Sequence, residues 1–231
     1  QCAGIWWEAL SPDYVTASGD SLEITVEAIR RSPIGIKLKS LKFNGLEKVK
    51  VNSDLPFNKV EQSKYTIFLP SDYPISQPYW LANPKTKGMF VVENQLLIGK
   101  PENDFALPVE AVFEINGVEI KALTPTQYKW TDPVDGEKYR PLAITPAITA
   151  NLDQSALLFA DEEGQTINVR LKAFVADISG EISLDLPEGW TVHPLSVTFN
   201  MEHKGEEATV PFLINPPEGQ SVGELKVKIN S

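Results

Sequence analysis

Residues 184–194 read Leu-Asp-Leu-Pro-Glu-Gly-Trp-Thr-Val-His-Pro, and this stretch decides the fold of the second half of the chain. Apolar residues occupy every second position before it, at 182–186, and after it, at Val197 and Phe199, which is the period of a half-buried β-strand. Pro187 and Gly189 lie between the two runs, where they favour a turn. The stretch therefore predicts two strands of a small β-sandwich.

The same alternation recurs through the first half of the chain. It is found at residues 22–28, 34–38, 65–69 and 109–115. Asn44-Gly45 and Asn116-Gly117 are two-residue hairpin signals, so neighbouring strands are expected to be antiparallel. Between Leu38 and Leu41 the apolar phase slips by one residue, which predicts a β-bulge. Helical periodicity is almost absent, and the chain is expected to be nearly all β.

We predict two consecutive antiparallel β-sandwich domains of immunoglobulin-like or fibronectin-like type. The first spans residues 1–142 and contains a Pro-rich and aromatic excursion at 70–88, which is too long for a hairpin turn. The second spans residues 143–231 and has the strand number of an immunoglobulin-like domain. Its strands are expected at residues 144–150, 156–159, 167–174, 181–186, 195–199, 208–214 and 225–229.

The charge composition excludes some partners. The net charge is -10, with 21 Lys and Arg against 31 Asp and Glu. Nucleic-acid binding needs clustered basic residues, so we expect no nucleic-acid partner. No apolar run approaches the roughly 20 residues that span a bilayer, so we also expect no membrane span. The acidity is concentrated in residues 143–231, which hold 5 basic and 13 acidic residues.

The start of the chain suggests a processed or partial polypeptide. It opens with Gln, and residues 5–7 already have the character of a strand, without the basic and apolar regions of a signal peptide. We expect the chain to be the C-terminal part of a longer polypeptide, or one from which a signal peptide has been removed. The expected location is periplasmic or extracellular. The single cysteine, Cys2, excludes an internal disulfide and a cysteine-based zinc site.

No catalytic centre can be identified in the sequence. The two histidines, His193 and His203, are too few for a zinc hydrolase site, and no Gly-x-Ser-x-Gly string is present. The acidic run at 161–164 could bind calcium through carboxylate oxygens, but it lacks an EF-hand-like ligand pattern and is more typical of a solvated turn. We therefore expect no metal, no cofactor and no enzymatic activity in these residues.

The aromatic residues are the better clue to function, because carbohydrate-binding modules use flat rings against the C–H faces of sugars. All six Tyr and four of the five Trp fall in the first domain. The candidate glycan-binding residues are Tyr79, Trp80, Trp130, Asp132, Tyr139 and Arg140, with Gln77 as a further polar group. The alternative is that Trp80 and Trp130 only pack the excursion onto the sandwich. Trp190 is expected to plug the end of the second core.

Two resemblances to known families cover most of the chain. Residues 166–229 resemble the immunoglobulin-like module associated with NPCBM domains in bacterial α-galactosidases, through the strings Ile-Asn-Val at 167–169, Leu-Pro-Glu-Gly-Trp at 186–190, Val-Thr-Phe at 197–199 and Val-Pro-Phe at 210–212. The first domain resembles the region downstream of the catalytic domain in large bacterial PIG-L (LmbE-like) deacetylases. The strings that carry this second resemblance are at 77–81, 88–90, 99–103, 128–133 and 136–142.

The second resemblance implies a non-catalytic role. The catalytic domain of that family carries a zinc site introduced by an Ala-His-Pro-Asp-Asp-Glu type motif, in which metal-bound water attacks an N-acetyl group. Here His193-Pro194 is followed by Leu195 and Ser196 instead of the two acids. The resemblance therefore implies accessory domains that position the catalytic domain of the same polypeptide or contact its glycan. The alternative is an independent glycan-binding or cell-surface adhesion protein.

Overall fold

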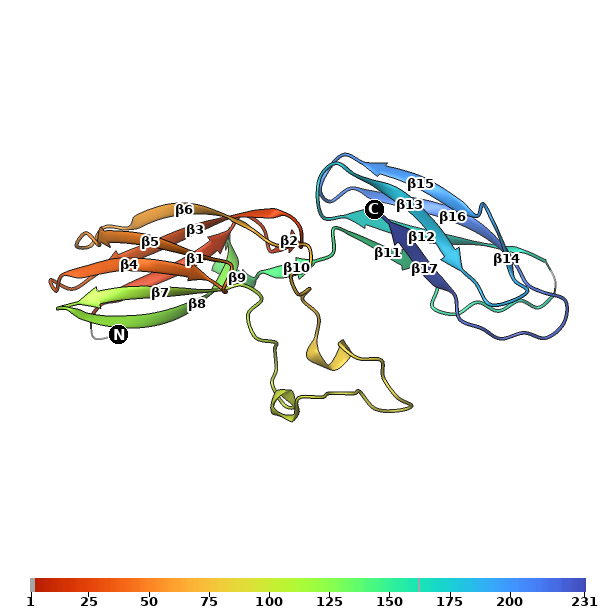
Figure 1. Ribbon diagram of the computed structural model, residues 1–231, viewed down its shortest axis with the longest axis horizontal. Coiled ribbons are helices and arrows are strands. Elements are labelled where there is room, and N and C mark those ends of the chain that lie inside the picture. The colour runs from red at the N-terminus through yellow and green to blue at the C-terminus, as the bar shows by residue number, and fades with distance from the viewer. Residues whose placement is uncertain (1–2, 162) are drawn as a thin grey trace. The chain divides into compact units, whose positions relative to one another are not determined.

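A computed structural model describes residues 3–161 and 163–231, which divide into two compact units, Gln1–Thr145 and Pro146–Ser231 (Figure 1). The described residues are nearly all β, as expected, with only two single 3-10 turns, η1 (Tyr79–Leu81) and η2 (Gln95–Leu97). None of the helical segments described is long and apolar enough to cross a membrane. The sequence-based boundary at 142/143 assigned residues 143–145 to the second domain, whereas the structure pairs them with a strand of the first unit.

The first unit is built on one long sheet with the strand order β5-β4-β7-β8-β1-β3-β6, and β9 pairs with β8 beside this path. A separate pair joins β10 to β2. The strands are β1 (Ile5–Ser11), β2 (Val15–Ala17), β3 (Ser21–Arg30), β4 (Ile36–Phe43), β5 (Glu47–Asp54), β6 (Glu61–Phe68), β7 (Pro108–Ile115), β8 (Val118–Asp132), β9 (Gly136–Pro141) and β10 (Ala143–Thr145).

The local turn signals in this unit are confirmed. Asn116 and Gly117 alone connect β7 to β8, with φ values of 50° and 79°, whereas Asn44 and Gly45, with φ values of 38° and 80°, begin a connection between β4 and β5 that also includes Leu46. Both residues of each pair are in the left-handed region, as a type I′ hairpin turn requires. The register of β4 shifts between Leu38 and Ser40 against both neighbouring strands, which confirms the predicted bulge.

The long sheet curls nearly into a barrel around one core. The ring centroid of Phe43, in β4 near one end of the strand order, lies 5.6 Å from that of Tyr65, in the terminal strand β6 at the other end. Trp7 of β1 meets Phe113 of β7 edge-on at 5.8 Å. One face of the sheet therefore closes on itself, and Phe43, Leu41 and other apolar side chains on that face are fully buried.

The expectation of purely antiparallel pairing was wrong at two places in the first unit. β1 pairs with β8 in parallel, and so does β10 with β2. Alternation of apolar residues reveals which face of a strand is buried but not the direction of its neighbour. A parallel pair needs a long connection, and these strands are far apart in the sequence.

The second unit consists of two antiparallel sheets, β11-β12-β16-β14 and β15-β13-β17, which contribute to one shared core. Phe212 and Ile167 from the first sheet lie in the same buried cluster as Ile182 and Phe199 from the second. The strands are β11 (Ile148–Leu152), β12 (Gln165–Ala173), β13 (Ile178–Asp185), β14 (Thr191–His193), β15 (Ser196–Met201), β16 (Glu207–Asn215) and β17 (Lys226–Asn230).

One expected strand in this unit is wrong. Residues 156–159 are irregular, although their apolar character had suggested a strand, because they have no neighbouring strand to pair with. The short strand β14 on the edge of the four-stranded sheet, directly after the Pro-Glu-Gly-Trp turn, was not predicted.

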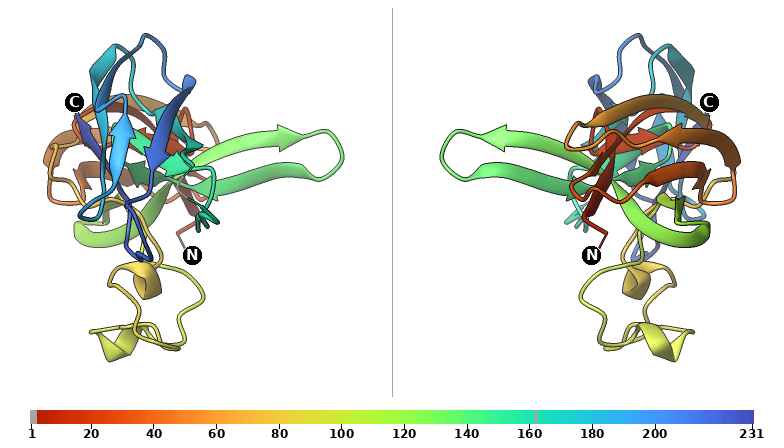
Figure 2. Two further views of the ribbon diagram at one scale, coloured as in Figure 1. Left: turned by 90° about the vertical axis from the view of Figure 1, so that its right-hand side faces the viewer. Right: turned by 90° about the vertical axis from the view of Figure 1, so that its left-hand side faces the viewer.

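The excursion of the first unit is longer than the predicted range of 70–88 and occupies all the residues between β6 and β7. Its two ends are fixed by Leu69 and Leu107, which are fully buried. Most of its apolar side chains are exposed: Ile75, Leu81, Met89, Phe90, Leu96, Ile98 and Phe105. Figure 2 shows the excursion, in yellow, and the β8–β9 hairpin, in light green, projecting from the sheet in different directions.

Candidate functional site

The β8–β9 hairpin positions most of the candidate residues by its register. Tyr128 lies opposite Arg140, Trp130 opposite Lys138, and Asp132 opposite Gly136. Because successive side chains on a strand point to opposite faces, Tyr128, Trp130, Lys138 and Arg140 share one face of the hairpin. The ordinary side-chain alternation of two paired strands therefore places two aromatic and two basic residues on the same face.

Three rings on this face form a row, which we call the ring row: Tyr14, Tyr128 and Trp130. Tyr128 and Trp130 are stacked, with centroids 5.6 Å apart and planes 16° from parallel. Tyr14, from the turn before β2, lies 6.2 Å from Tyr128, and the guanidinium carbon of Arg140 lies 3.8 Å from the Tyr14 ring centroid. Tyr14 is exposed and the other two rings are partly exposed, so the row presents aromatic side chains at the surface.

Asp132 has a structural role at the end of this face. One of its carboxylate oxygens, Oδ1, accepts hydrogen bonds from the backbone N–H groups of Val134 at 2.8 Å and Asp135 at 2.9 Å. These two donors hold the pKa of Asp132 below its usual value. The second oxygen lies 3.8 Å from Nζ of Lys138, which also pairs with Asp135. Asp132 therefore fixes the hairpin turn and Lys138 beside the ring row.

Tyr139 lies on the opposite face of the hairpin, away from Trp130 and Arg140. There Lys129 is 5.8 Å from the ring centroids of both Tyr139 and Trp6, and its Nζ is 2.5 Å from a carboxylate oxygen of Glu8. Glu8 is buried, and its hydrogen bond with Lys129 is the main reason that the pKa of Lys129 is raised. This cluster is an internal ion pair covered by rings.

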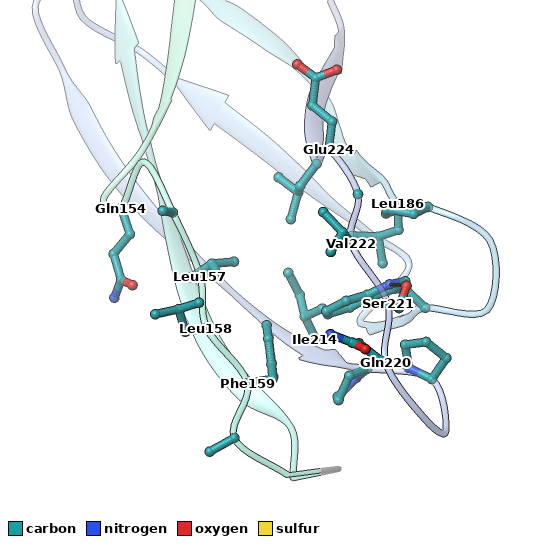
Figure 3. Close-up of a pocket in the computed structure, with 18 of the residues that line it drawn as sticks. Gln154, Leu157, Leu158, Phe159, Leu186, Ile214, Gln220, Ser221, Val222 and Glu224 are labelled. Atoms are coloured by element: carbon teal, nitrogen blue, oxygen red, sulfur yellow. Dashed lines mark hydrogen bonds between the residues drawn. The ribbon is translucent and has the colours of Figure 1, made fainter.

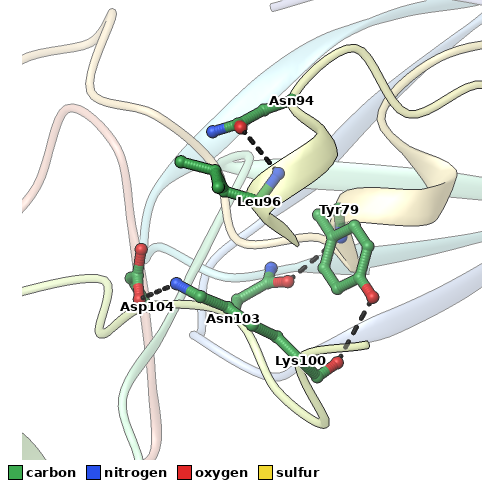
Figure 4. A network of polar contacts seen from close by, with 6 residues as sticks. All are labelled: Tyr79, Asn94, Leu96, Lys100, Asn103 and Asp104. Atoms are coloured by element: carbon green, nitrogen blue, oxygen red, sulfur yellow. Dashed lines mark hydrogen bonds and ion pairs between the residues drawn. The ribbon is translucent and has the colours of Figure 1, made fainter. Parts of the chain in front are cut away.

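Tyr79 and Trp80 lie on η1 within the excursion and contact each other edge-on at 4.9 Å. The hydroxyl of Tyr79 donates to the carbonyl of Lys100 at 3.3 Å, and its N–H donates to Oδ1 of Asn103 at 3.0 Å (Figure 4). The side-chain amide of Asn103 in turn donates to the carbonyl of Gln77. These bonds hold two distant parts of the excursion together.

The structure therefore does not gather the six candidate residues into one cluster. Within the described residues, neither Tyr79 nor Trp80 has a ring contact with Trp130. Within the excursion, Tyr73 and Ala106 pack against the core, and the hydroxyl of Tyr73 donates to the carbonyl of Ala106 at 2.9 Å. The sequence had suggested Trp80 and Trp130 for that role, because aromatic anchors under long loops are common in β-sandwiches.

The remaining candidate positions form no site in the part of the chain that is described. His193 lies in β14, and His203 lies in the turn before β16, where its N–H donates to Glu206. No group of three His, Cys, Asp or Glu side chains that could hold a metal occurs among the described residues. Within the acidic run, Asp161 accepts a hydrogen bond from the N–H of Glu163. Cys2 and Glu162 lie outside the described residues.

A cleft in the second unit was missed by sequence reasoning. It has a volume of about 770 Å³ and lies between residues 152–161 and 214–225 (Figure 3). Trp190 lines it and also packs against the core, with the ring of Phe159 edge-on at 5.0 Å and its indole N–H donating to Ser221 at 3.1 Å. The sequence feature that could have indicated the cleft is the apolar run at 156–159, which is too hydrophobic for a loop fully exposed to water.

Comparison with known proteins adds little. No family model matches the chain, and no curated protein matches it. Among solved structures, the chain is similar to a protein of unknown function from Porphyromonas gingivalis W83, with 9% identity over 92% of this chain and 83% of that one. The TM-score is 0.23, which establishes no common fold.

Proposed function

We propose that the chain is a pair of immunoglobulin-like or fibronectin-like accessory domains of a larger bacterial PIG-L-like N-acetylglucosaminyl deacetylase. In this proposal the chain is non-catalytic, acts in the periplasm or outside the cell, and holds the glycan near the catalytic domain. The observation that carries the proposal is the ring row with Arg140 and Lys138 beside it.

The chemistry of this face suits a sugar chain. The exposed parts of the stacked rings can contact the C–H groups of a sugar, and the neighbouring cationic side chains can donate hydrogen bonds to hydroxyl or acetamido oxygens. Arg140 is exposed and lies against Tyr14, so its guanidinium is already oriented before a ligand arrives.

The family part of the proposal is supported by where the resembling strings lie. Those at 77–81, 88–90 and 99–103 belong to the excursion, and those at 128–133 and 136–142 form the β8–β9 hairpin. Apart from the buried Leu142, they lie on projecting surface segments instead of the core, where shared residues would serve packing alone. The second candidate is an independent glycan-binding or adhesion protein, which the same ring row also favours.

Trp130→Ala is expected to weaken the binding of N-acetylated glucosamine oligosaccharides at least about 10-fold, because it removes the largest flat ring of the row. Isothermal titration calorimetry with chitotetraose, and with cellotetraose as the non-acetylated probe, measures the loss. Tyr139→Ala is the matched control: it removes a ring from the same hairpin but from the opposite face, and should leave the affinity unchanged.

Trp80→Ala tests the other aromatic candidate. Equal losses in Trp130→Ala and Tyr139→Ala, or no binding of either oligosaccharide by the parent protein, would contradict glycan contact at the ring row. A loss confined to Trp80→Ala would move the glycan site to the excursion. Melting temperatures of all three variants must be measured alongside, so that unfolding is not mistaken for loss of contact.

The reading frame upstream of the first residue separates the two candidate functions. An accessory role in a PIG-L-like enzyme requires an upstream α/β domain that contains a His-Pro-Asp-Asp motif in the same polypeptide. DNA sequencing of the gene checks this. A frame that holds only a signal peptide before residue 1 would exclude the accessory role and leave the independent glycan-binding protein.

A further inference from the structure

The cleft of the second unit has an apolar interior. Figure 3 shows Phe159 and Ile214 between two chain segments, one carrying Leu157 and the other Val222. Leu186 and Trp190 also belong to the apolar lining. A cleft of about 770 Å³ is in the size range of ligand sites in general. The interior can therefore hold several apolar groups of a bound partner.

The charge of the cleft selects against anions. Its lining contains no Lys, Arg or His among the described residues, and its two charged members are the carboxylates of Asp161 and Glu224. Glu224 is exposed and lies 3.5 Å from Lys226, at the outer end of the cleft. Because the second unit as a whole has 13 acidic and 5 basic residues, a bound partner should be neutral or positively charged.

The two segments that flank the cleft have free backbone groups. Residues 154–160 and 217–225 belong to no strand and make no backbone–backbone hydrogen bond within the described chain. A side-chain amide, from Gln165, reaches the carbonyl of Leu158 at 2.8 Å. Each segment therefore leaves backbone N–H or C=O groups available to a bound partner.

The side chains on these segments are exposed to an unusual degree. Leu158 on one side of the cleft is 90% exposed and Val222 on the other is 94% exposed. Large apolar side chains at the mouth of an apolar cleft lose water when a partner covers them, at roughly 25 cal/mol per Å² of buried apolar surface. Together with the unpaired backbone, they match an extended peptide better than a sugar, which would need a free ring face.

We propose that this cleft binds an extended polypeptide segment with apolar side chains at alternate positions and a basic residue at its end. The peptide backbone pairs with residues 154–160 or 217–225, its apolar side chains enter the cleft over Trp190 and Phe159, and its basic end approaches the exposed carboxylate of Asp161. The inference concerns the second unit only and is independent of glycan binding at the ring row.

A peptide array gives the first test on the intact protein. The probes are capped heptapeptides that alternate leucine or valine with threonine and end in lysine, compared with the same peptides ending in glutamate and with versions N-methylated at alternate backbone positions. We expect binding of the lysine peptides, at least 10-fold weaker binding of the glutamate peptides, and loss of binding after N-methylation. Absence of any binder, or equal binding of methylated and unmethylated peptides, would overturn the proposal.

Variants at the mouth of the cleft locate the binding. Leu158→Lys and Val222→Lys should each weaken the best peptide at least 10-fold, because each removes an apolar contact and adds a repelling charge. Leu195→Lys is the matched control, since Leu195 is 78% exposed in the same unit but does not line the cleft. All three positions are exposed, so folding should be unaffected. Equal effects of the three variants would show nonspecific attraction to the acidic unit and would refute the proposed site.

Discussion

The Lys129→Met variant is expected to lose about 3 kcal/mol in the free energy of unfolding of the first unit, the lower end of the range for breaking a buried ion pair. The side chain of Glu8 is only 6% exposed, and Lys129 is its partner at 2.5 Å. Methionine keeps most of the apolar stem but leaves the carboxylate buried and without its counter-charge. The contacts of the ammonium group with the Trp6 and Tyr139 rings are lost as well.

The pH dependence of this effect has a definite sign. The pKa of Lys129 is raised above 10.5, first by its hydrogen bond with Glu8. A raised pKa means that the stabilisation is fully present below the unfolded value and is lost as the pH rises through the folded value. The difference between parent and variant should thus be constant from pH 7 to about 10 and should shrink above it.

Tyr139 faces the same cluster and also titrates in this alkaline range, because burial raises its pKa above 10.0. The comparison is therefore best made in a Tyr139→Phe background, which removes the second titration. Urea unfolding at several pH values measures the free energies. The double variant Glu8→Leu/Lys129→Met should recover most of the loss, since no unpaired charge remains. A loss below about 1 kcal/mol in the single variant would mean that the pair behaves as a solvated surface pair.

Phe212→Ala should destabilise the second unit by about 4 kcal/mol, within the usual range for truncating a buried phenylalanine. Phe212 is fully buried in the shared core of the two sheets and lies opposite Ile167 in the register of β12 and β16. The loss combines the transfer of an aromatic ring to water with the cavity that remains. The first unit has its own buried cluster and should not be affected.

Scanning calorimetry checks both halves of this expectation. Phe212→Ala should lower one melting transition, and Phe113→Ala, which truncates a 2% exposed ring of the other core, should lower the other. If either substitution shifted every transition equally, the two cores would be thermodynamically one. Retained chitotetraose binding in Phe212→Ala would further show that the ring row does not depend on the second unit.

The local features of the fold could be predicted because neighbouring residues determine them. The Asn116-Gly117 hairpin and the bulge after Leu38 each depend on a few adjacent positions. Strand partners could not be predicted in this way. Pro125 lies within β8, where the pairing of that strand with β7 ends and its pairing with β1 begins. The exchange depends on β1, more than a hundred residues earlier.

The candidate site was predictable only in part, for a related reason. Trp130 and Arg140, two of the candidate residues, share one face of the hairpin because of its register. Tyr139 was placed with them by its sequence neighbourhood, although strand alternation puts residues 139 and 140 on opposite faces. Tyr14 was missed, since its approach to Arg140 is created by the tertiary fold.

The excursion joins β6 to β7 through Leu69 and Leu107, which are both fully buried and bonded to the sheet unit: the carbonyl of Leu69 accepts from Gly19, and that of Leu107 accepts from Thr126. Between Ser76, which is hydrogen-bonded to Ile144, and Ala106, which packs against the core, the chain can change length at low cost, because doubling a flexible loop adds only about 0.6 kcal/mol of closure entropy. The excursion is therefore a surface segment that can be altered while the sheet of the first unit keeps its structure. The contacts that the excursion makes with a partner can be redesigned between Ser76 and Ala106. The sheet, the Glu8–Lys129 ion pair and the ring row would be unchanged.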